Sequence, residues 1–128
     1  MTHNFPKIIH QIWFDFKDLP NIPEHFNKNV ESWKNHNPDW DYKVWDLETA
    51  VKIIKDEYPG YLNTFNEFKY NISKCDFFRY ILMNKYGGMY IDLDFLCIRP
   101  INYFLDLLEQ NSINKLNESV DTSIVLTE

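Results

Sequence analysis

Hydrophobic and polar residues along this chain follow two different periods, one typical of strands and one typical of helices. Residues 7–14, KIIHQIWF, form a compact β-branched and aromatic run that predicts a buried first strand. Apolar and polar positions alternate over residues 40–45, which predicts a second strand. Short apolar runs at residues 89–92, 96–98 and 123–126 predict three more strands.

Between these runs, the apolar residues recur every three or four positions, the spacing of one helix face. Proline and glycine mark the breaks between the segments. The predicted helices cover residues 23–35, 47–58, 61–70, 73–86 and 102–109. Because strands and helices alternate, the sequence predicts an α/β fold with ligands at the carboxyl ends of the strands.

The helix at residues 73–86 has the clearest end signals. Ser73 with Asp76 three residues later resembles a capping box, and Gly87-Gly88 provides a left-handed stop. Asp76 and Arg79 lie three positions apart and therefore share a face of this helix. They could form an exposed ion pair, or they could face the same cleft as the carboxylates that follow the next strand.

Asp92 and Asp94 are those carboxylates, and they come where the apolar run 89–91 ends. Alternate residues of an extended backbone share a face, so the two side chains are predicted to point the same way. Like charges 4 Å apart repel by about 4 kcal/mol at an effective dielectric constant near 20, which favours a divalent cation between them and an anionic substrate. Mn²⁺ or Mg²⁺ fits this oxygen donor set. The alternative is two solvated residues at a strand end.

The 128 residues are enough for a single domain spanning residues 1–128, with a polar tail at residues 110–128. The chain is 45% hydrophobic and 17% aromatic, which excludes a disordered protein. Its net charge of −6 disfavours nucleic acid as a partner. No apolar run is long enough for a membrane span and no signal peptide is evident, so we expect a soluble, cytoplasmic protein. Cys75 and Cys97 have no metal-ligand spacing and are predicted to be buried free thiols.

Several motifs occur together in one order: PKIIHQIW, PDWDYKVWD, KCDFFRYILMNKYGGMYIDLD and a strand ending in Arg-Pro. Over roughly residues 6–104 this order resembles the glycosyltransferases of the DXD sugar-binding family, which includes the fungal initiating mannosyltransferases. It is more remotely similar to the glucosylating domain of large clostridial toxins. The resemblance implies a GT-A-like fold, a Rossmann-type nucleotide-sugar-binding sheet flanked by helices, truncated here relative to the family.

The resemblance also implies roles for individual residues. Trp13 matches a position that stacks on the nucleobase, although a core aromatic residue is an equally good interpretation of the sequence. Ile12 and Tyr90 are placed among the substrate-binding residues with it. Asp76 and Arg79 match a pair that contacts the hydroxyl groups of the transferred sugar, and Arg79 could also reach the phosphate.

Three residues are expected to be catalytic by the same resemblance: Arg79, Asp92 and Asp94. Asp92 matches the carboxylate that contacts ribose and sugar, and Asp94 matches the metal ligand. A bound cation would stabilise the negative charge of the departing nucleoside diphosphate. The residues identify no nucleophile.

The expected function is therefore a metal-dependent retaining transferase that moves a hexose from a nucleotide-diphospho-sugar, with a UDP-sugar favoured, to a glycan or protein acceptor. One alternative is a nucleotide-sugar-binding module with little turnover, or one that completes its site with a partner chain as a homo-oligomer. A second is an aspartate phosphatase, but those enzymes follow the second Asp with Gly-Thr or Val, and Phe95-Leu96 stands here. A bacterial or viral cytoplasmic setting is expected.

Overall fold

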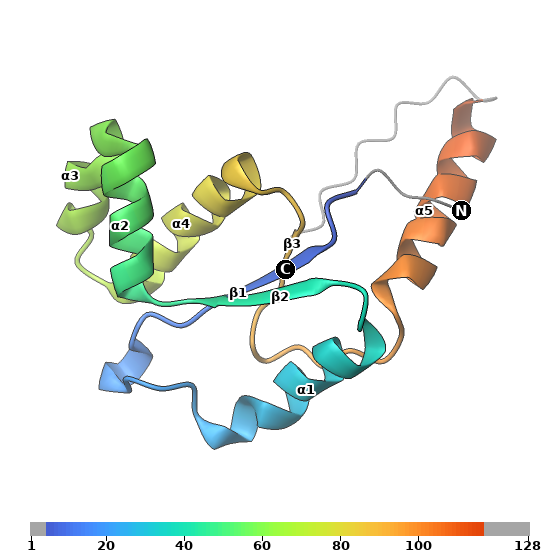
Figure 1. Cartoon of the computed structure of the whole chain (residues 1–128), viewed down its shortest axis with the longest axis horizontal. Helices are drawn as coiled ribbons and strands as arrows, with labels where there is room; N and C mark the ends of the chain where they lie inside the picture. The colour runs from blue at the N-terminus through green and yellow to red at the C-terminus, as the bar shows by residue number, and fades with distance from the viewer. Residues whose placement is uncertain (1–4, 117–128) are drawn as a thin grey trace.

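The computed structural model describes residues 5–116, which form a small parallel sheet with helices on both faces (Figure 1). The strands are β1 (Ile8–Ile12), β2 (Asp41–Trp45) and β3 (Met89–Tyr90). β1 lies in the centre and runs parallel to both neighbours, so the strand order is β2-β1-β3. The predicted α/β class with a Rossmann-type parallel sheet is confirmed.

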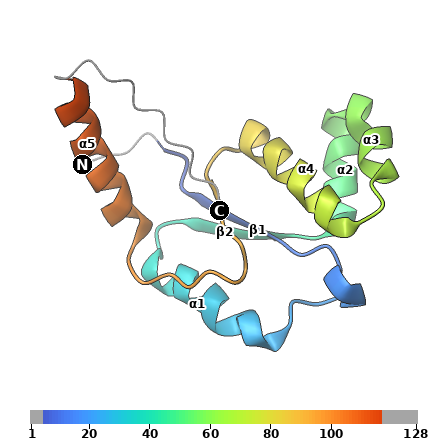
Figure 2. The same ribbon diagram turned by 180° about the vertical axis from the view of Figure 1, so that it is seen from behind.

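Helices and short 3₁₀ turns connect and flank the strands. They are η1 (Phe16–Asp18), η2 (Glu24–Phe26), α1 (Asn27–His36), α2 (Leu47–Glu57), η3 (Pro59–Tyr61), α3 (Leu62–Glu67), α4 (Asn71–Lys85) and α5 (Ile101–Leu116). Figures 1 and 2 show α2, α3 and α4 together on one side of the sheet, and α1 with the loop after β3 on the other. α5 lies at the edge of the sheet where the strands begin, opposite their carboxyl ends. Among the described residues, no helix is long and apolar enough to cross a membrane.

The two sides of the sheet bury separate hydrophobic clusters, because successive strand residues point to opposite faces. Ile12 and Tyr90 pack with the residues of α2, α3 and α4, including the fully buried Phe78. Ile9 and Met89 pack with the first turns of α5 on the other side. Cys75 and Cys97 are both buried and free, as the sequence predicted. The sheet is therefore the shared wall of two cores.

A turn of two glycines joins α4 to β3. Gly87 has φ +68° and Gly88 has φ +90°, a conformation that residues with a Cβ rarely adopt. A Cβ at Gly88 would lie 2.5 Å from the carbonyl oxygen of Ile8, which leaves no room for a side chain. The turn therefore brings the backbone of the α4–β3 connection into direct contact with the start of β1.

Several predicted boundaries differ from the structure. The predicted strand at residues 96–98 is wrong, because these residues form a loop without sheet pairing. The predicted strand at residues 89–92 ends at Tyr90. The last described helix continues to Leu116 instead of stopping at residue 109, so it enters the predicted polar tail. The predicted strand at residues 123–126 lies outside the described residues.

The predicted capping box is also wrong. α4 begins at Asn71, two residues before Ser73, and its cap residue Tyr70 has no side-chain capping bond. The Asn71 side chain instead donates a hydrogen bond to the carbonyl oxygen of Phe14 (2.7 Å). This long-range bond ties the start of α4 to the end of β1, an interaction that a local motif cannot indicate.

His10 is fully buried in β1, and two contacts fix its protonation state. Its Nδ1 accepts a hydrogen bond from Trp45 Nε1 (3.0 Å), so the neutral ring carries its proton on Nε2, which donates to the carbonyl oxygen of Gly87 (2.8 Å). Burial lowers the pKa of His10 below its ordinary value of 6.5, although the bond to Gly87 acts in the opposite direction. The neutral His10 ring thus joins β1 to Trp45 of β2 and to the Gly87 turn that precedes β3.

We expect Gly88→Ala to lower the free energy of unfolding by about 3 kcal/mol, because alanine must adopt a left-handed φ against the Ile8 carbonyl. Gly60→Ala is the matched control, since a Cβ there meets no atom within 4 Å. Urea denaturation of both variants measures the difference. Equal stability of the two variants would contradict this account of the turn.

We expect the free energy of unfolding to decrease as the pH falls below 6.5, because the unfolded chain then binds a proton at His10 that the folded chain resists. The slope from this residue is at most about 1.4 kcal/mol per pH unit. Denaturation curves between pH 7.5 and 5 for the natural chain and for His10→Gln isolate its contribution. A variant curve with the same slope would refute the prediction.

Candidate active site

The side chains predicted from the sequence to form a site come from three places in the fold. Ile12 and Trp13 lie at the carboxyl end of β1, Asp76 and Arg79 lie on α4, and the Asp-x-Asp segment follows β3. The carboxyl ends of parallel strands meet at one edge of the sheet, where α/β proteins bind ligands. The outermost of these residues, Ile12 and Asp94, are 82 positions apart, yet the topology brings them to one edge.

A pocket of about 440 Å³ lies at this edge, a volume suited to a small-molecule ligand. It is lined by all seven predicted residues: Ile12, Trp13, Asp76, Arg79, Tyr90, Asp92 and Asp94. Five lining residues were not predicted: Phe16, Phe26, Ile72, Cys75 and Leu93. Phe16 and Phe26 come from the 3₁₀ turns η1 and η2, whose position at this edge the hydrophobic period does not predict.

Asp92 and Asp94 reach the pocket from a turn. The sequence pattern had placed them on one face of an extended strand, and that geometry is wrong. The Phe95 amide donates to the carbonyl oxygen of Asp92 (3.2 Å), which closes a tight turn around Leu93. The Gln11 side chain of β1 donates to the same carbonyl (3.5 Å). Asp94 is exposed and Asp92 is partly buried.

Arg79 is held over the floor of the pocket by two contacts. Its guanidinium carbon lies 4.9 Å from the centre of the Tyr90 ring, a cation–π geometry. A terminal nitrogen also pairs with Asp76, whose side chain is 60% exposed while that of Arg79 is 14% exposed. The cation is therefore largely withdrawn from bulk water, and its partner carboxylate stands at the rim.

The floor of the pocket is neutral. Cys75 Sγ lies 3.6 Å from the hydroxyl oxygen of Tyr90, and both residues are buried. Burial raises the pKa of the Cys75 thiol, and burial followed by the neighbouring Cys75 and Asp92 raises the pKa of Tyr90. The acidic and basic side chains that line the pocket are Asp76, Asp92, Asp94 and Arg79.

Trp13 forms an aromatic wall of the pocket with two phenylalanines. Its ring meets Phe16 edge-on, with centroids 5.0 Å apart, and lies 6.3 Å from Phe26. The indole nitrogen donates to the carbonyl oxygen of Leu19 (2.8 Å), which fixes the ring. Trp13 is 8% exposed, so it is both a packed residue and a lining residue. Such a wall can stack on a planar ligand.

Side chains of α1 hold the loop that follows β3. Asn29 Nδ2 donates to the carbonyl oxygen of Leu93 (3.0 Å), and Trp33 Nε1 donates to that of Phe95 (2.8 Å). The Cys97 amide donates to Ser32 Oγ (2.8 Å). These bonds replace the sheet pairing that the loop lacks, so α1 determines where the two aspartates stand.

The oxygen donors at the rim are suited to a hard divalent cation that keeps water or phosphate ligands. No three His, Cys, Asp or Glu side chains in the described part of the chain lie close enough to hold a metal ion on their own. Mg²⁺ and Mn²⁺ sites that also bind phosphate commonly use only one or two protein carboxylates. Asp92 and Asp94 fit that requirement.

Comparison with known proteins identifies the family of this chain. Residues 23–119 match the family model described as a glycosyltransferase sugar-binding region containing a DXD motif. The chain therefore belongs to this family of glycosyltransferases, and the predicted resemblance is confirmed. Members of the family generally use divalent cations. No solved structure gives a significant match to the chain.

Several curated relatives are yeast enzymes. A mannosyl phosphorylinositol ceramide synthase of Saccharomyces cerevisiae is 41% identical over 100 residues, which cover 78% of this chain and 25% of that protein. An inositol phosphoceramide mannosyltransferase of Schizosaccharomyces pombe is 35% identical, with 78% and 31% covered. The initiation-specific alpha-1,6-mannosyltransferase of Candida albicans is 29% identical, with 90% and 30% covered. The chain thus spans about a quarter to a third of these three relatives.

These relatives correct the expected setting. The sequence predicted a cytoplasmic protein in a bacterial or viral setting, and the cytoplasmic location is wrong. The relatives just described are fungal mannosyltransferases, two of them named for a ceramide lipid, which is a membrane component. The prediction had used the first residues of the sequence and the amino-acid usage, and neither reports where such an enzyme works.

We expect Ser32→Ala to speed hydrogen exchange at the Cys97 amide by about fivefold, because the loop loses a hydrogen bond of about 1 kcal/mol. Ser73→Ala, on α4, is the control. Amide exchange followed by NMR measures both variants. Unchanged protection at Cys97 would show that α1 does not hold the loop through this bond.

Proposed function

We propose that the pocket at the carboxyl end of β1 binds a nucleotide sugar together with Mn²⁺ or Mg²⁺, as the donor site of a mannosyltransferase. One observation supports this most strongly: every side chain that the family resemblance assigns to donor binding lines the same pocket. Trp13 would stack on the base, and Asp76 with Arg79 would contact the sugar. The site residues and their roles are our assignment.

Asp94, with Asp92 beside it, would hold the cation at the rim. A bound Mn²⁺ or Mg²⁺ would supply Lewis-acid stabilisation of the charge on the leaving diphosphate. Arg79 would add a fixed positive charge on the side of the diphosphate away from the cation. Because its side chain is only 14% exposed, water screens this charge weakly. Tyr90 keeps its proton, so it can only orient Arg79 and donate a hydrogen bond. We propose retention of the anomeric configuration from the family resemblance, without assigning a nucleophile.

The donor and acceptor are proposed from the relatives. The sequence favoured a UDP-sugar, but the relatives are named mannosyltransferases, so we propose GDP-mannose as the donor. The expected glycan or protein acceptor is replaced in this proposal by a lipid with a phosphoinositol head group, since two of the relatives are named for a lipid of that kind. All the residues that we assign to donor binding line this one pocket, so the proposal can be tested directly on this chain.

We expect GDP-mannose to bind only with Mn²⁺ or Mg²⁺, and Asp94→Asn to weaken binding at least tenfold, because it removes a charged metal ligand. Asp56→Asn, an exposed carboxylate on α2, is the matched control and should bind normally. Isothermal titration calorimetry with each metal and with EDTA gives the affinities. An unchanged affinity in Asp94→Asn would reject the metal site, and equal binding of UDP-glucose would reject the donor assignment.

A further inference from the structure

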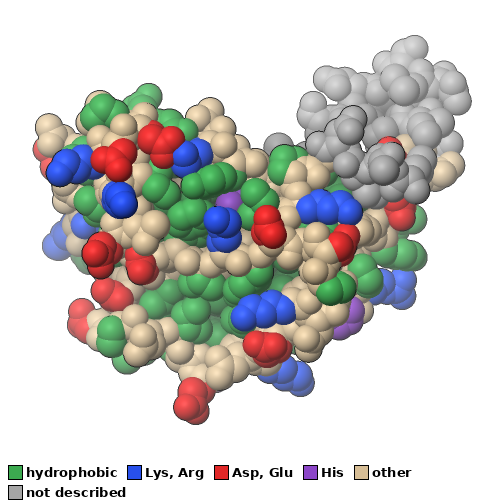
Figure 3. Space-filling model, viewed as in Figure 1, with side chains coloured by type: hydrophobic (Ala, Val, Ile, Leu, Met, Phe, Trp, Pro, Cys, Tyr) green, Lys and Arg blue, Asp and Glu red, His purple; other side chains and the backbone are tan. Residues whose placement is uncertain are grey.

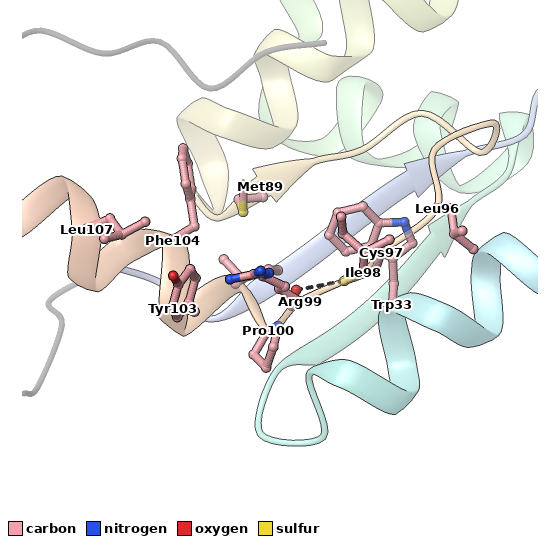
Figure 4. Close-up of a pocket in the computed structure, with 11 residues that line it drawn as sticks. Trp33, Met89, Leu96, Cys97, Ile98, Arg99, Pro100, Tyr103, Phe104 and Leu107 are labelled. Atoms are coloured by element: carbon pink, nitrogen blue, oxygen red, sulfur yellow. Dashed lines mark hydrogen bonds between the residues drawn. The ribbon is translucent and has the colours of Figure 1, made fainter.

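A second pocket, the apolar pocket, lies between the loop after the Asp-x-Asp turn and the first turns of α5 (Figure 4). Its volume is about 300 Å³, and Met89 at the start of β3 and Trp33 of α1 contribute to its walls. Five large hydrophobic side chains that line it are also exposed to solvent: Leu96, Ile98, Tyr103, Phe104 and Leu107.

This degree of apolar exposure needs a physical reason. Ile98 is 75% exposed and Leu107 is 47% exposed, and both face the same hollow. Single exposed hydrophobic residues are ordinary, but a concave surface built from several of them marks a binding site. The lining favours a flexible hydrocarbon over a polar ligand.

The position of the apolar pocket relates it to the donor pocket. Leu96 follows Asp94 by two residues, so their Cα atoms are no more than about 7 Å apart. Figure 4 shows Leu96 and Leu107 at opposite ends of the apolar pocket. A ligand that extends from Leu107 toward Leu96 would therefore point its other end toward the donor pocket.

Arg99 adds one positive charge to these apolar walls. It is exposed, and its guanidinium carbon lies 5.0 Å from the centre of the Tyr103 ring. Stacking on an aromatic ring orders a guanidinium group while leaving its N–H donors available to phosphate oxygens. An apolar hollow with one ordered cation is complementary to an amphiphile that carries a phosphate and an alkyl chain.

We propose that the apolar pocket binds the alkyl chain of the lipid acceptor, with Arg99 contacting its phosphate, and so presents the head group to the donor pocket. This inference rests on the proposed function for the choice of a lipid as acceptor. Its physical basis is separate, because the residues that line the apolar pocket include none of those that line the donor pocket. Ile98, Phe104 and Leu107 would contact the chain.

Binding of n-alkyl phosphates below their micelle concentrations tests the proposal without donor or metal. Each methylene that enters an apolar site raises the affinity about fourfold, so decyl phosphate should bind roughly 15-fold more tightly than octyl phosphate. NMR titration of the whole chain should shift the amides of residues 96–107. We expect Ile98→Asn and Leu107→Asn each to weaken decyl phosphate at least fivefold. Tyr80→Asn, 71% exposed on α4, should leave binding unchanged.

A comparison of a charged and an uncharged amphiphile tests the role of Arg99. Arg99→Gln should weaken octyl phosphate about tenfold and leave the uncharged octyl glucoside unaffected, because only the phosphate loses a charge-assisted contact. Equal effects on both amphiphiles would reject the assigned phosphate contact. The natural protein with each amphiphile serves as the reference.

Two results would overturn the proposal. One is the absence of any dependence of affinity on chain length. The other is a dimer in analytical ultracentrifugation that Ile98→Asn dissociates while alkyl phosphates do not bind, which would assign the apolar pocket to a second copy of the chain. Failure of GDP-mannose to bind would refute the proposed donor but leave the alkyl titration unaffected, so the two proposals fail independently.

Discussion

The contact between the Gly88 backbone and the carbonyl of Ile8 determines how the two halves of the proposed donor pocket meet. On one side of the glycine turn, α4 carries Asp76 and Arg79. On the other side, β3 leads into the two aspartates. Because the turn seats both elements against β1 with no side chain between them, a small shift there would separate Asp76 and Arg79 from the two aspartates that follow β3. His10 reinforces this seat through its bond to the Gly87 carbonyl.

The charges of the donor pocket are arranged by burial as much as by sequence. Arg79 is shielded on the Tyr90 ring, whereas Asp76 and Asp94 stand in water. Exposed carboxylate oxygens are open to a ligand, so the rim can attract a cation. A shielded guanidinium acts on an anion through a lower effective dielectric constant. The arrangement suits a ligand whose diphosphate lies between the rim and the floor.

Much of this architecture could be predicted from local sequence patterns. The strand KIIHQIWF, the helix that ends at Gly87-Gly88 and the Asp-x-Asp segment all have strong local signals, and the structure contains each of them. Residues 96–98 show the limit, because a β-branched and apolar run predicts a strand only where another strand is available to pair with it. Here the run lies along α1, and the Cys97 amide bonds to Ser32 Oγ.

Seven of the residues that line the proposed donor pocket were predicted from the sequence, but the way the fold builds the pocket was not. The family resemblance identified the seven residues, while the shared face of Asp92 and Asp94 was inferred from an extended backbone that becomes a turn. Phe16, Phe26 and the hydrogen bonds from α1 to the loop after β3 depend on contacts between segments far apart in the sequence. A helical or strand period carries no information about such contacts. The start of α4 was missed for the same reason, since Asn71 bonds to Phe14, 57 residues earlier.

The sheet register also has a consequence for how the molecule assembles. Ile9 pairs with Tyr42 across 33 positions and with Met89 across 80, so the second pairing closes a much longer loop. Loop closure becomes entropically more costly with length, and long-range strand pairing is accordingly slow. The ligand-binding edge therefore cannot exist until nearly the whole described chain has come together. Recognition of a ligand at that edge would report on complete folding, and not on any early collapsed intermediate.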